Sequence, residues 1–402
     1  MFRNIAIFYL VIAQSAGLAI TLDSQDARIG VEIDIFSRDG VLPSQDYQSN
    51  ISIFFQSESL WQWNQSRDSL SFKPYFRVDQ RDPEKSHADI RELIWMRSNR
   101  DWSLSIGLGK VFWGVTEFNH LVDVINQTDL VEGIDGEAKL GQPMINLSLI
   151  NHWGALEFFV LPGFRERTFA GEDGRLRTLV EIDRNRVFYE SSEMDKHVDF
   201  AVRWSDSFKH FDLGIYLFDG TNREPSLDIQ PVFYETQLTS FVATANYQQM
   251  TQLGIDFQGV LDNWLFKWEA LSRITSKDHF LASQAGIEYT FYNIKGRSID
   301  VGVLFEYGWD ERGLASSSVI ENDFFIGSRF SFNDFKISEL LLGMAYDQDY
   351  YSYSAFLEFT QSASDNTQVS LQANFFQAKN PADILNNIAG DDYIQLTFEH
   401  FF

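Results

Sequence analysis

The side chains that most often carry out catalysis or bind metal ions are sparse and scattered in this sequence. The seven histidines never form a His-x-x-x-His pair, and there is no cysteine, so the sequence does not support a zinc site or a cysteine nucleophile. A Gly-x-Ser-x-Gly turn and a glycine-rich phosphate loop are also absent, although a serine and a histidine on neighbouring strands would leave no spacing signature. We therefore expect no enzyme, no metal site and no cofactor.

Ionisable side chains instead recur at every second position of apolar segments, as expected for groups that face water inside a pore. The principal candidates on this face are Lys73, Arg77, Arg203, Asp256, Lys267, Glu269 and Arg329. The same face includes Arg273 and the acidic residues Glu32, Asp34, Glu58, Asp79, Asp199, Glu288, Asp300, Glu306 and Glu358. On a lipid face a basic group would cost about 2–4 kcal/mol at mid-membrane. Because acidic groups outnumber basic ones, we expect weak selection of cations; the alternative is that these groups only hydrate the interior.

Two long links carry the candidates for a constriction. The link Gly114–Gly141 is acidic, with Glu117, Asp123 and Asp129 as the residues expected to face the pore. It also carries apolar residues, namely Leu121, Val122, Val124, Ile125 and Leu130. Apolar side chains are poorly placed in bulk water, so this link is expected to fold inward onto the barrel wall.

The second candidate, Pro162–Asp195, is rich in arginine. Arg165, Arg167, Arg175 and Arg177 could face the acidic link across a narrow opening and create a transverse field. The alternative is a solvated loop whose arginines pair with neighbouring carboxylates or bind lipopolysaccharide phosphates.

The elements that must position these groups are strands with one apolar face. In the segment that follows Ser298, the apolar residues Ile299, Val301, Val303, Phe305, Tyr307 and Trp309 alternate with Asp300, Gly302, Glu306 and Asp310. The segments 198–204 and 369–375 alternate in the same way. A period of two predicts strands with one lipid face and one lumen face, although soluble sheets alternate too.

The connections between these strands alternate between short and long. Short turns are expected at Asn64–Asp68, Ser98–Asp101, Ile150–Trp153, Ser205–Phe208, Leu261–Asn263, Asn293–Arg297, Phe332–Phe335 and Ser362–Asn366. Longer links are expected at Ser37–Asn50, Gln80–Ser86, Gly114–Gly141, Pro162–Asp195, Gly220–Tyr247, Ser276–His279, Glu311–Ile320, Gln348–Tyr350 and Ala378–Gly390. This pattern predicts an all-β, transmembrane antiparallel β-barrel of about 18 strands, with short periplasmic turns and long extracellular loops. Two of the links are short, so a count of about 16 is the alternative.

Both ends of the chain carry export signals. The segment Met1–Ala19 has a basic start, an apolar core and small residues before Ala19, which predicts a signal peptide cleaved near Ala19 and a barrel over residues 20–402. The last strand, Asp391–Phe402, places Ile394, Leu396, Phe398 and Phe402 on one face. This pattern is typical of the terminal strand that the barrel assembly machinery recognises; the alternative is an edge strand that ends in Phe by chance.

The bulk composition excludes several classes of protein. Beyond the first twenty residues no apolar run approaches the roughly 20 residues that a membrane-spanning helix needs. A formal net charge of −25 would repel a polyphosphate, so nucleic acid is not an expected partner. Expected partners are outer-membrane lipid and lipopolysaccharide, and a homo-oligomer is an open alternative.

The run GKVFWGVTEFNHLVDVINQTD at Gly109–Asp129 resembles a segment of poorly characterised proteobacterial outer-membrane porin-like β-barrel proteins. In those proteins a strand ends in Trp-Gly and leads into a loop with Asp-x-Ile-Asn-x-x-Asp. LPGFRERTF at Leu161–Phe169, FDGTNREPS at Phe218–Ser226 and IEYTFY at Ile287–Tyr292 are similar to other parts of the same family. The resemblance implies a barrel and a transport role, without catalytic residues or a substrate.

The sequence therefore leaves three functions open. The first is an outer-membrane channel for passive passage of small solutes. The second is an outer-membrane component of an export or lipid-transfer system, which an apolar lining or a lateral gap would support. The third is a non-conducting structural or adhesive barrel, which would have a lumen plugged by its loops.

Overall fold

The computed structural model describes residues 20–234, 237–316, 318 and 320–402; the expected signal peptide lies outside these residues. Eighteen strands form one sheet. Its first nine strands are β1 (Thr21–Phe36), β2 (Ser49–Trp63), β3 (Asp68–Asp79), β4 (His87–Ser98), β5 (Trp102–Gly109), β6 (Gln142–Asn151), β7 (Gly154–Pro162), β9 (Val198–Phe208) and β10 (Phe211–Thr221). The others are β13 (Gln249–Leu261), β14 (Trp264–Thr275), β15 (His279–Phe291), β16 (Asp300–Asp310), β17 (Asn322–Ser331), β18 (Glu339–Asp347), β19 (Tyr353–Ser364), β20 (Thr367–Gln377) and β21 (Tyr393–Phe401).

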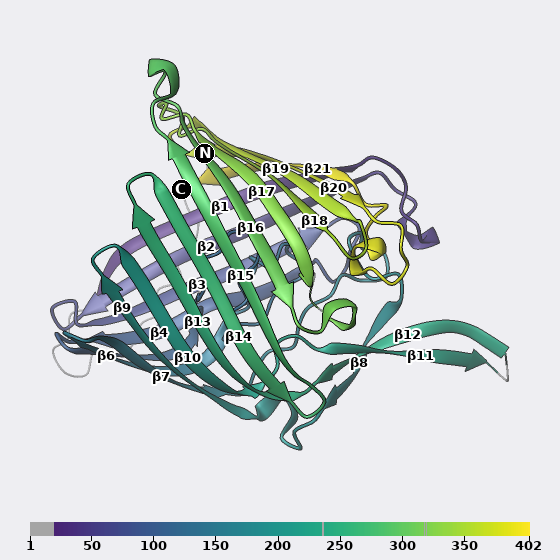
Figure 1. The fold of residues 1–402 in the computed structure, drawn as a ribbon, viewed down its shortest axis with the longest axis horizontal. Helices are drawn as coiled ribbons and strands as arrows, with labels where there is room; N and C mark the ends of the chain where they lie inside the picture. The colour runs from purple at the N-terminus through teal and green to yellow at the C-terminus, as the bar shows by residue number, and fades with distance from the viewer. Residues whose placement is uncertain (1–19, 235–236, 317, 319) are drawn as a thin grey trace, which may run out of the picture.

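The sheet closes on itself as a barrel (Figure 1). Each of its strands pairs antiparallel with the next one along the sheet, and β21 returns to β1 with the register Arg28↔Phe401 to Phe36↔Tyr393. Closure leaves no free sheet edge, so every strand can satisfy its backbone groups within the sheet. The predicted fold and the count of 18 strands are confirmed, and the alternative of 16 is wrong.

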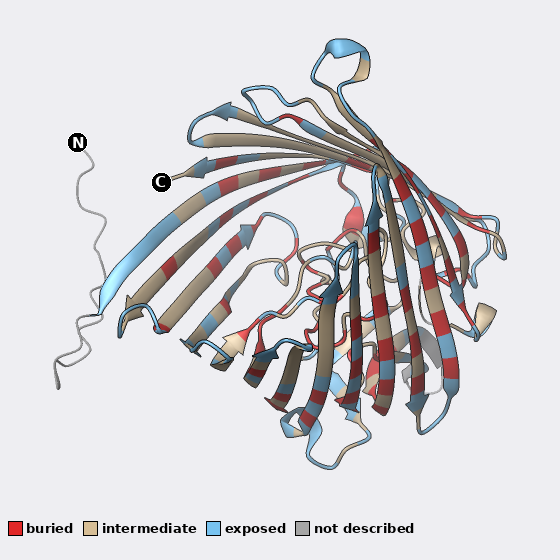
Figure 2. Cartoon of the chain, turned by 60° about the vertical axis from the view of Figure 1, so that its left-hand side comes forward, coloured by how far each residue is buried: buried red, intermediate tan, exposed pale blue. Residues whose placement is uncertain are grey.

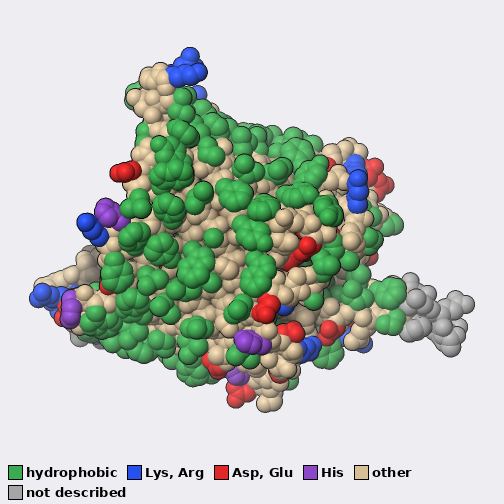
Figure 3. Space-filling model, in the orientation of Figure 1, with side chains coloured by type: hydrophobic (Ala, Val, Ile, Leu, Met, Phe, Trp, Pro, Cys, Tyr) green, Lys and Arg blue, Asp and Glu red, His purple; other side chains and the backbone are tan. Residues whose placement is uncertain are grey.

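The barrel wall is apolar on its outer face and polar on its inner face, which is the reverse of a soluble protein. In β15 the outward residues Leu281 and Ile287 are 46% and 44% exposed, whereas Gln284 and Glu288 are buried. In Figure 2 the same alternation appears as bands of buried and exposed residues along the strands. In Figure 3 apolar side chains cover the outer surface that faces the viewer. Because exposed apolar residues on this scale are unstable in water, the outer wall fits a lipid environment, and the polar face lines the lumen.

The strand ends confirm the alternation of short and long connections. One end of the barrel, called here the turn end, has connections of two to eight residues, such as 365–366, 64–67 and 292–299. The opposite loop end carries the longest ones, including 110–141 and 378–392, although 276–278 is short. The turn expected at Ser205–Phe208 is displaced, because β9 continues through Phe208 before the chain reverses.

Two of the expected loops contain strands of their own. The strands β8 (Glu181–Tyr189), β11 (Ser226–Tyr234) and β12 (Gln237–Tyr247) form a separate sheet in which β12 pairs antiparallel with β11 and parallel with β8. The β11–β12 hairpin projects away from the loop end (Figure 1). Regular helix is confined, among the described residues, to short 3-10 turns such as η5 (Ile384–Asn387). None of the described helices has the length and hydropathy needed to cross a membrane.

Candidate functional site: the loop inside the barrel

The segment 110–141, between β5 and β6, folds into the lumen. Val122, Val124 and Ile125 are 0%, 3% and 0% exposed. They pack in a cluster with Trp113 and with wall residues of five strands, namely Met144, Phe159, Leu161, Ala201, Tyr216, Phe218 and Met250. Burial of these aliphatic side chains against the inner wall, at roughly 1.5–3 kcal/mol for each, holds the segment inside. This inward fold agrees with the expectation from the apolar residues of the link.

Two buried carboxylates of the wall hold the backbone of the segment. Glu269 on β14 accepts hydrogen bonds from the amides of Val115 (2.6 Å) and Thr116 (2.9 Å) and from the Thr116 hydroxyl (2.7 Å). Glu306 on β16 accepts one from the Glu117 amide at 2.8 Å. Charged acceptors make hydrogen bonds worth about 1.5–3 kcal/mol each. These two glutamates therefore act as anchors of the segment.

The side chain of Glu117 links the segment to two further strands. Its carboxylate lies 3.2 Å from Lys267 Nζ on β14 and forms an ion pair with Arg329 on β17. Phe118 next to it stacks on Phe325 with ring centroids 4.8 Å apart. Although burial opposes it, the charges of Arg329 and Lys267 keep the pKa of Glu117 below its usual value. Glu117 is therefore charged and paired at neutral pH.

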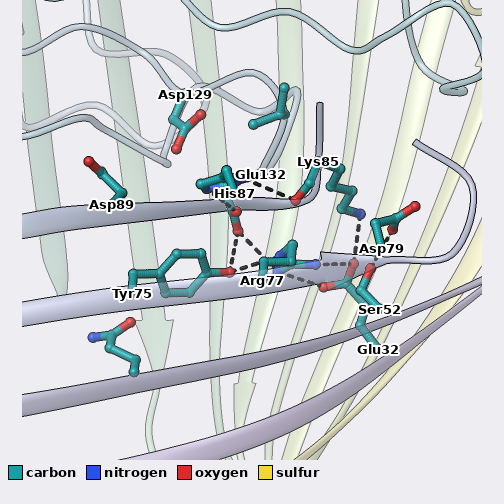
Figure 4. Close-up of polar contacts among 12 residues, drawn as sticks. Glu32, Ser52, Tyr75, Arg77, Asp79, Lys85, His87, Asp89, Asp129 and Glu132 are labelled. Carbon is teal, nitrogen blue, oxygen red and sulfur yellow. Dashed lines mark hydrogen bonds and ion pairs between the residues drawn. The ribbon is translucent and has the colours of Figure 1, made fainter. Parts of the chain in front are cut away.

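The far side of the same segment reaches the opposite wall of the barrel. Glu132 lies 3.0 Å from Arg77 on β3 and accepts a hydrogen bond from Tyr75 at 2.7 Å, as Figure 4 shows. Asp129 is paired with Arg91 on β4 and accepts a hydrogen bond from Thr168 at 2.6 Å. The segment thus crosses the lumen from β14–β17 to β3–β4.

One group of side chains in this network has the composition of a metal site. Ligand atoms of His87, Asp129 and Glu132 all lie within 4.8 Å of one another. The carboxylates already face the guanidinium groups of Arg77 and Arg91. A divalent ion placed there would be repelled by both arginines, so the arrangement fits an ion-pair network better than a metal centre.

Two cavities lie on either side of the segment. The loop-side cavity measures about 1130 Å³ and the turn-side cavity about 530 Å³. Lys139 lines both of them. So does strand β20, which contributes Asn374 to the loop-side cavity and Ser370 to the turn-side cavity. The space beside Lys139 and β20, called here the passage, therefore borders both cavities.

On the loop side of this passage the charged groups are mostly acidic, whereas six basic and four acidic residues line the turn-side cavity. Asp135, Glu137 and Glu358 line the loop-side cavity near Lys139, and Lys139 itself lies 3.1 Å from Asp123. We therefore expect the electrostatic potential on the loop side of the passage to favour cations.

A histidine is coupled to this passage. His120 Nε2 lies 3.0 Å from Glu137 Oε1. The hydrogen bond from His120 lowers the pKa of Glu137. Burial disfavours the charged imidazole, but the hydrogen bond and charge of Glu137 raise the pKa of His120 above its usual value.

The four arginines of the link Pro162–Asp195 do not form one group. Arg165 lies 2.9 Å from Asp89, and Arg167 donates to Gln127 of the inward segment at 3.1 Å. Arg175 is buried and lies 2.6 Å from Asp391. Arg177 donates to the carbonyl oxygen of Thr178 at 3.1 Å. Of the four, Arg167 and Arg177 line the loop-side cavity.

The remaining candidates occupy positions consistent with their expected faces. Lys73 lies 2.9 Å from Glu58, and Arg203 lies 2.7 Å from Asp256, all on the lumen face. On β21 the outward residues Ile394 and Phe398 are 42% and 44% exposed, Leu396 is half-buried between them, and Phe402 follows the strand at 66%. Their role in assembly stays a prediction.

Sequence reasoning did not single out Lys139, His120 or Glu137 as pore residues. All three lie in the link Gly114–Gly141, but irregular segments have no periodicity that shows which side chains face a cavity. The acidic composition of the link predicted that this segment faces the pore, but it did not predict which of its residues line the cavities.

Comparisons with known proteins bear on the fold alone. No protein-family model and no curated protein matches the sequence. Among solved structures, Pseudomonas aeruginosa OccK3 (OpdO) is similar with a TM-score of 0.54 and 8% identity over 95% of this chain and 96% of that one. A mutant of the Rh. blastica porin has a TM-score of 0.45 and 10% identity, with coverage of 96% and 100%. The family resemblance of the loop segments is not tested by these matches.

Proposed function

We propose that the protein is an outer-membrane channel through which small hydrophilic solutes pass passively, with segment 110–141 setting the narrowest point. The observation that carries the proposal is the pair of cavities that share Lys139 as a lining residue inside a closed barrel. Its lumen face is polar and its outer face apolar, the arrangement of transmembrane barrels that conduct. The similarity of the fold to OccK3 supports the same architecture.

The proposal includes location and partners. The export signal at Met1–Ala19 would be removed, and the apolar outer wall would contact outer-membrane lipid and lipopolysaccharide. The barrel assembly machinery would insert the chain through β21, and self-association through the apolar wall stays open. An export or lipid-transfer role is less favoured, because the described strands form a closed ring without a lateral gap.

Planar-bilayer recording of the purified mature chain tests the proposal. We expect discrete conductance steps and a reversal potential under a KCl gradient that indicates weak cation preference. The double variant D135N/E358Q should reduce this preference, while E193Q, on an exposed part of the 163–197 loop, should leave it unchanged. Absence of any conductance from correctly folded protein would favour the structural or adhesive barrel instead.

A further inference from the structure

Four carboxylates gather at the loop end of β17 and β18. Glu321 precedes β17, Asp323 lies at its start, Asp347 ends β18, and Asp383 caps η5 in the 378–392 loop. They are 7%, 4%, 8% and 5% exposed, and all four line the loop-side cavity. The cluster defined by these four residues, called here the acidic cluster, thus joins two neighbouring strands to a distant loop.

The acidic cluster has no cationic partner within the described part of the chain. Glu321, although more than nine-tenths buried, makes no side-chain hydrogen bond or ion pair with any described residue. The Oδ2 atom of Asp383 is also buried without a hydrogen-bond partner. Asp323 and Asp347 accept hydrogen bonds only from backbone amides, for example from Glu321 at 2.9 Å and from Asp349 at 2.7 Å.

This absence of partners contrasts with the inward segment, where Glu117, Asp129 and Glu132 each face lysine or arginine. Burying several like charges together is unfavourable unless protons or a cation neutralise them. The four buried carboxylates have no lysine or arginine partner among the described residues, so a bound cation would compensate for the cost of burying them together.

We propose that the acidic cluster binds one hard divalent cation, Ca²⁺ being the best fit, which ties the 378–392 loop to the ends of β17 and β18. Carboxylate oxygens are the ligands that Ca²⁺ prefers, and its six to eight ligands can include carbonyls and water. No three of these described carboxylates lie within 4.8 Å of one another, so the ion keeps water molecules between itself and some of them. Nitrogen and sulfur ligands are absent from the four, which disfavours zinc.

The test uses the mature chain refolded into detergent without lipopolysaccharide, because lipopolysaccharide phosphates bind Ca²⁺ themselves. Calorimetric titration with CaCl₂ at constant ionic strength should show one saturable site per chain. Thermal unfolding should occur at a higher temperature in Ca²⁺ than in EDTA, since a ligand that binds only the folded state stabilises it. No saturable binding, or an unfolding temperature that Ca²⁺ does not change, would overturn the proposal.

Matched variants assign the binding to the cluster. E321Q and D383N should each weaken Ca²⁺ binding at least tenfold, whereas E193Q should bind like the wild type. Undiminished binding in E321Q and D383N would contradict the site, and this outcome is independent of whether the barrel conducts.

Discussion

At the scale of residues, the lumen is organised by pairs whose members come from distant parts of the chain. Glu117 and Lys267 are 150 positions apart, yet their side chains meet inside the barrel. Such pairs fix the inward segment at defined points and leave a few charges near the passage, among them Glu358, without an ion-pair partner among the described residues. The permeation properties should therefore depend on a small number of side chains.

The pair of His120 and Glu137 should make the channel sensitive to pH. A raised pKa means that the folded protein holds the His120 proton more tightly than the unfolded chain does. The pair therefore stabilises the segment below about pH 6.5, and the contribution is lost as the pH rises through the raised pKa. Deprotonation also removes a positive charge beside the passage, so cation preference should increase between pH 5 and pH 8.

Reversal potentials measured over this pH range check the prediction, with H120Q as the comparison. The variant should show a smaller change than the wild type, because it has no proton to lose at this position. Identical pH profiles of H120Q and the wild type would show that His120 does not affect permeation.

Alternation along the strands was sufficient to identify the lumen charges such as Arg77 and Arg203 from the sequence. Their partners could not be predicted, because Glu132 and similar residues belong to irregular segments whose position depends on tertiary packing. For the same reason the arginines of the 163–197 loop were expected as one group, although Arg175 is buried against Asp391.

At the scale of elements, segment 110–141 depends on its anchors more than on regular structure. Replacing Glu269 by Ala would leave the amides of Val115 and Thr116 without their acceptor, at a cost of about 1–3 kcal/mol. E269A should therefore lower the free energy of unfolding and produce noisier channels. E288A on β15 is the matched control, since Glu288 is also a buried lumen glutamate but makes no hydrogen bond to the described segment. Denaturant titration and single-channel recording would show equal effects of the two variants if the anchor assignment were incorrect.

The terminal strand provides a second prediction at this scale. Phe398 faces outward opposite Val31 of β1 and Val369 of β20, where the barrel closes. Deleting Phe402 or introducing F398D should strongly reduce the amount of protein in the outer membrane, because a charge or a missing aromatic residue weakens the lipid-compatible face. S192D, on an exposed loop, should have little effect. Immunoblots of outer-membrane fractions measure this, and wild-type levels of the Phe402 deletion would contradict the role of this strand.

Most barrel strands and their connections were predictable because the period of two and the turn residues are local signals. The segments that form β8, β11 and β12 were interpreted as loops, because no local sequence pattern distinguishes a strand inside a long connection from a strand of the barrel wall. Counting β8 alone in the wall would have given an odd number of strands, whereas counting β11 and β12 together would have kept it even. Their pairing into a separate sheet, parallel between β8 and β12, depends on contacts that no local pattern shows.

At the scale of the whole molecule, the proposed function requires one continuous path across the closed barrel along β20, beside the inward segment. The chain has no cysteine, so single cysteines can be introduced without background reactivity. Ser370 lines the turn-side cavity next to the passage, whereas Ser192 is exposed on a loop outside both cavities. A charged group attached at the first position should obstruct the path, and one attached at the second should not.

The most direct test is therefore single-channel recording of S370C and S192C before and after addition of a charged methanethiosulfonate reagent, with labelling verified by mass spectrometry. We expect modification of S370C to reduce conductance in discrete steps and modification of S192C to leave it unchanged. Fully labelled S370C channels with unaltered conductance would contradict the path along β20, and folded protein that never conducts would contradict the channel itself.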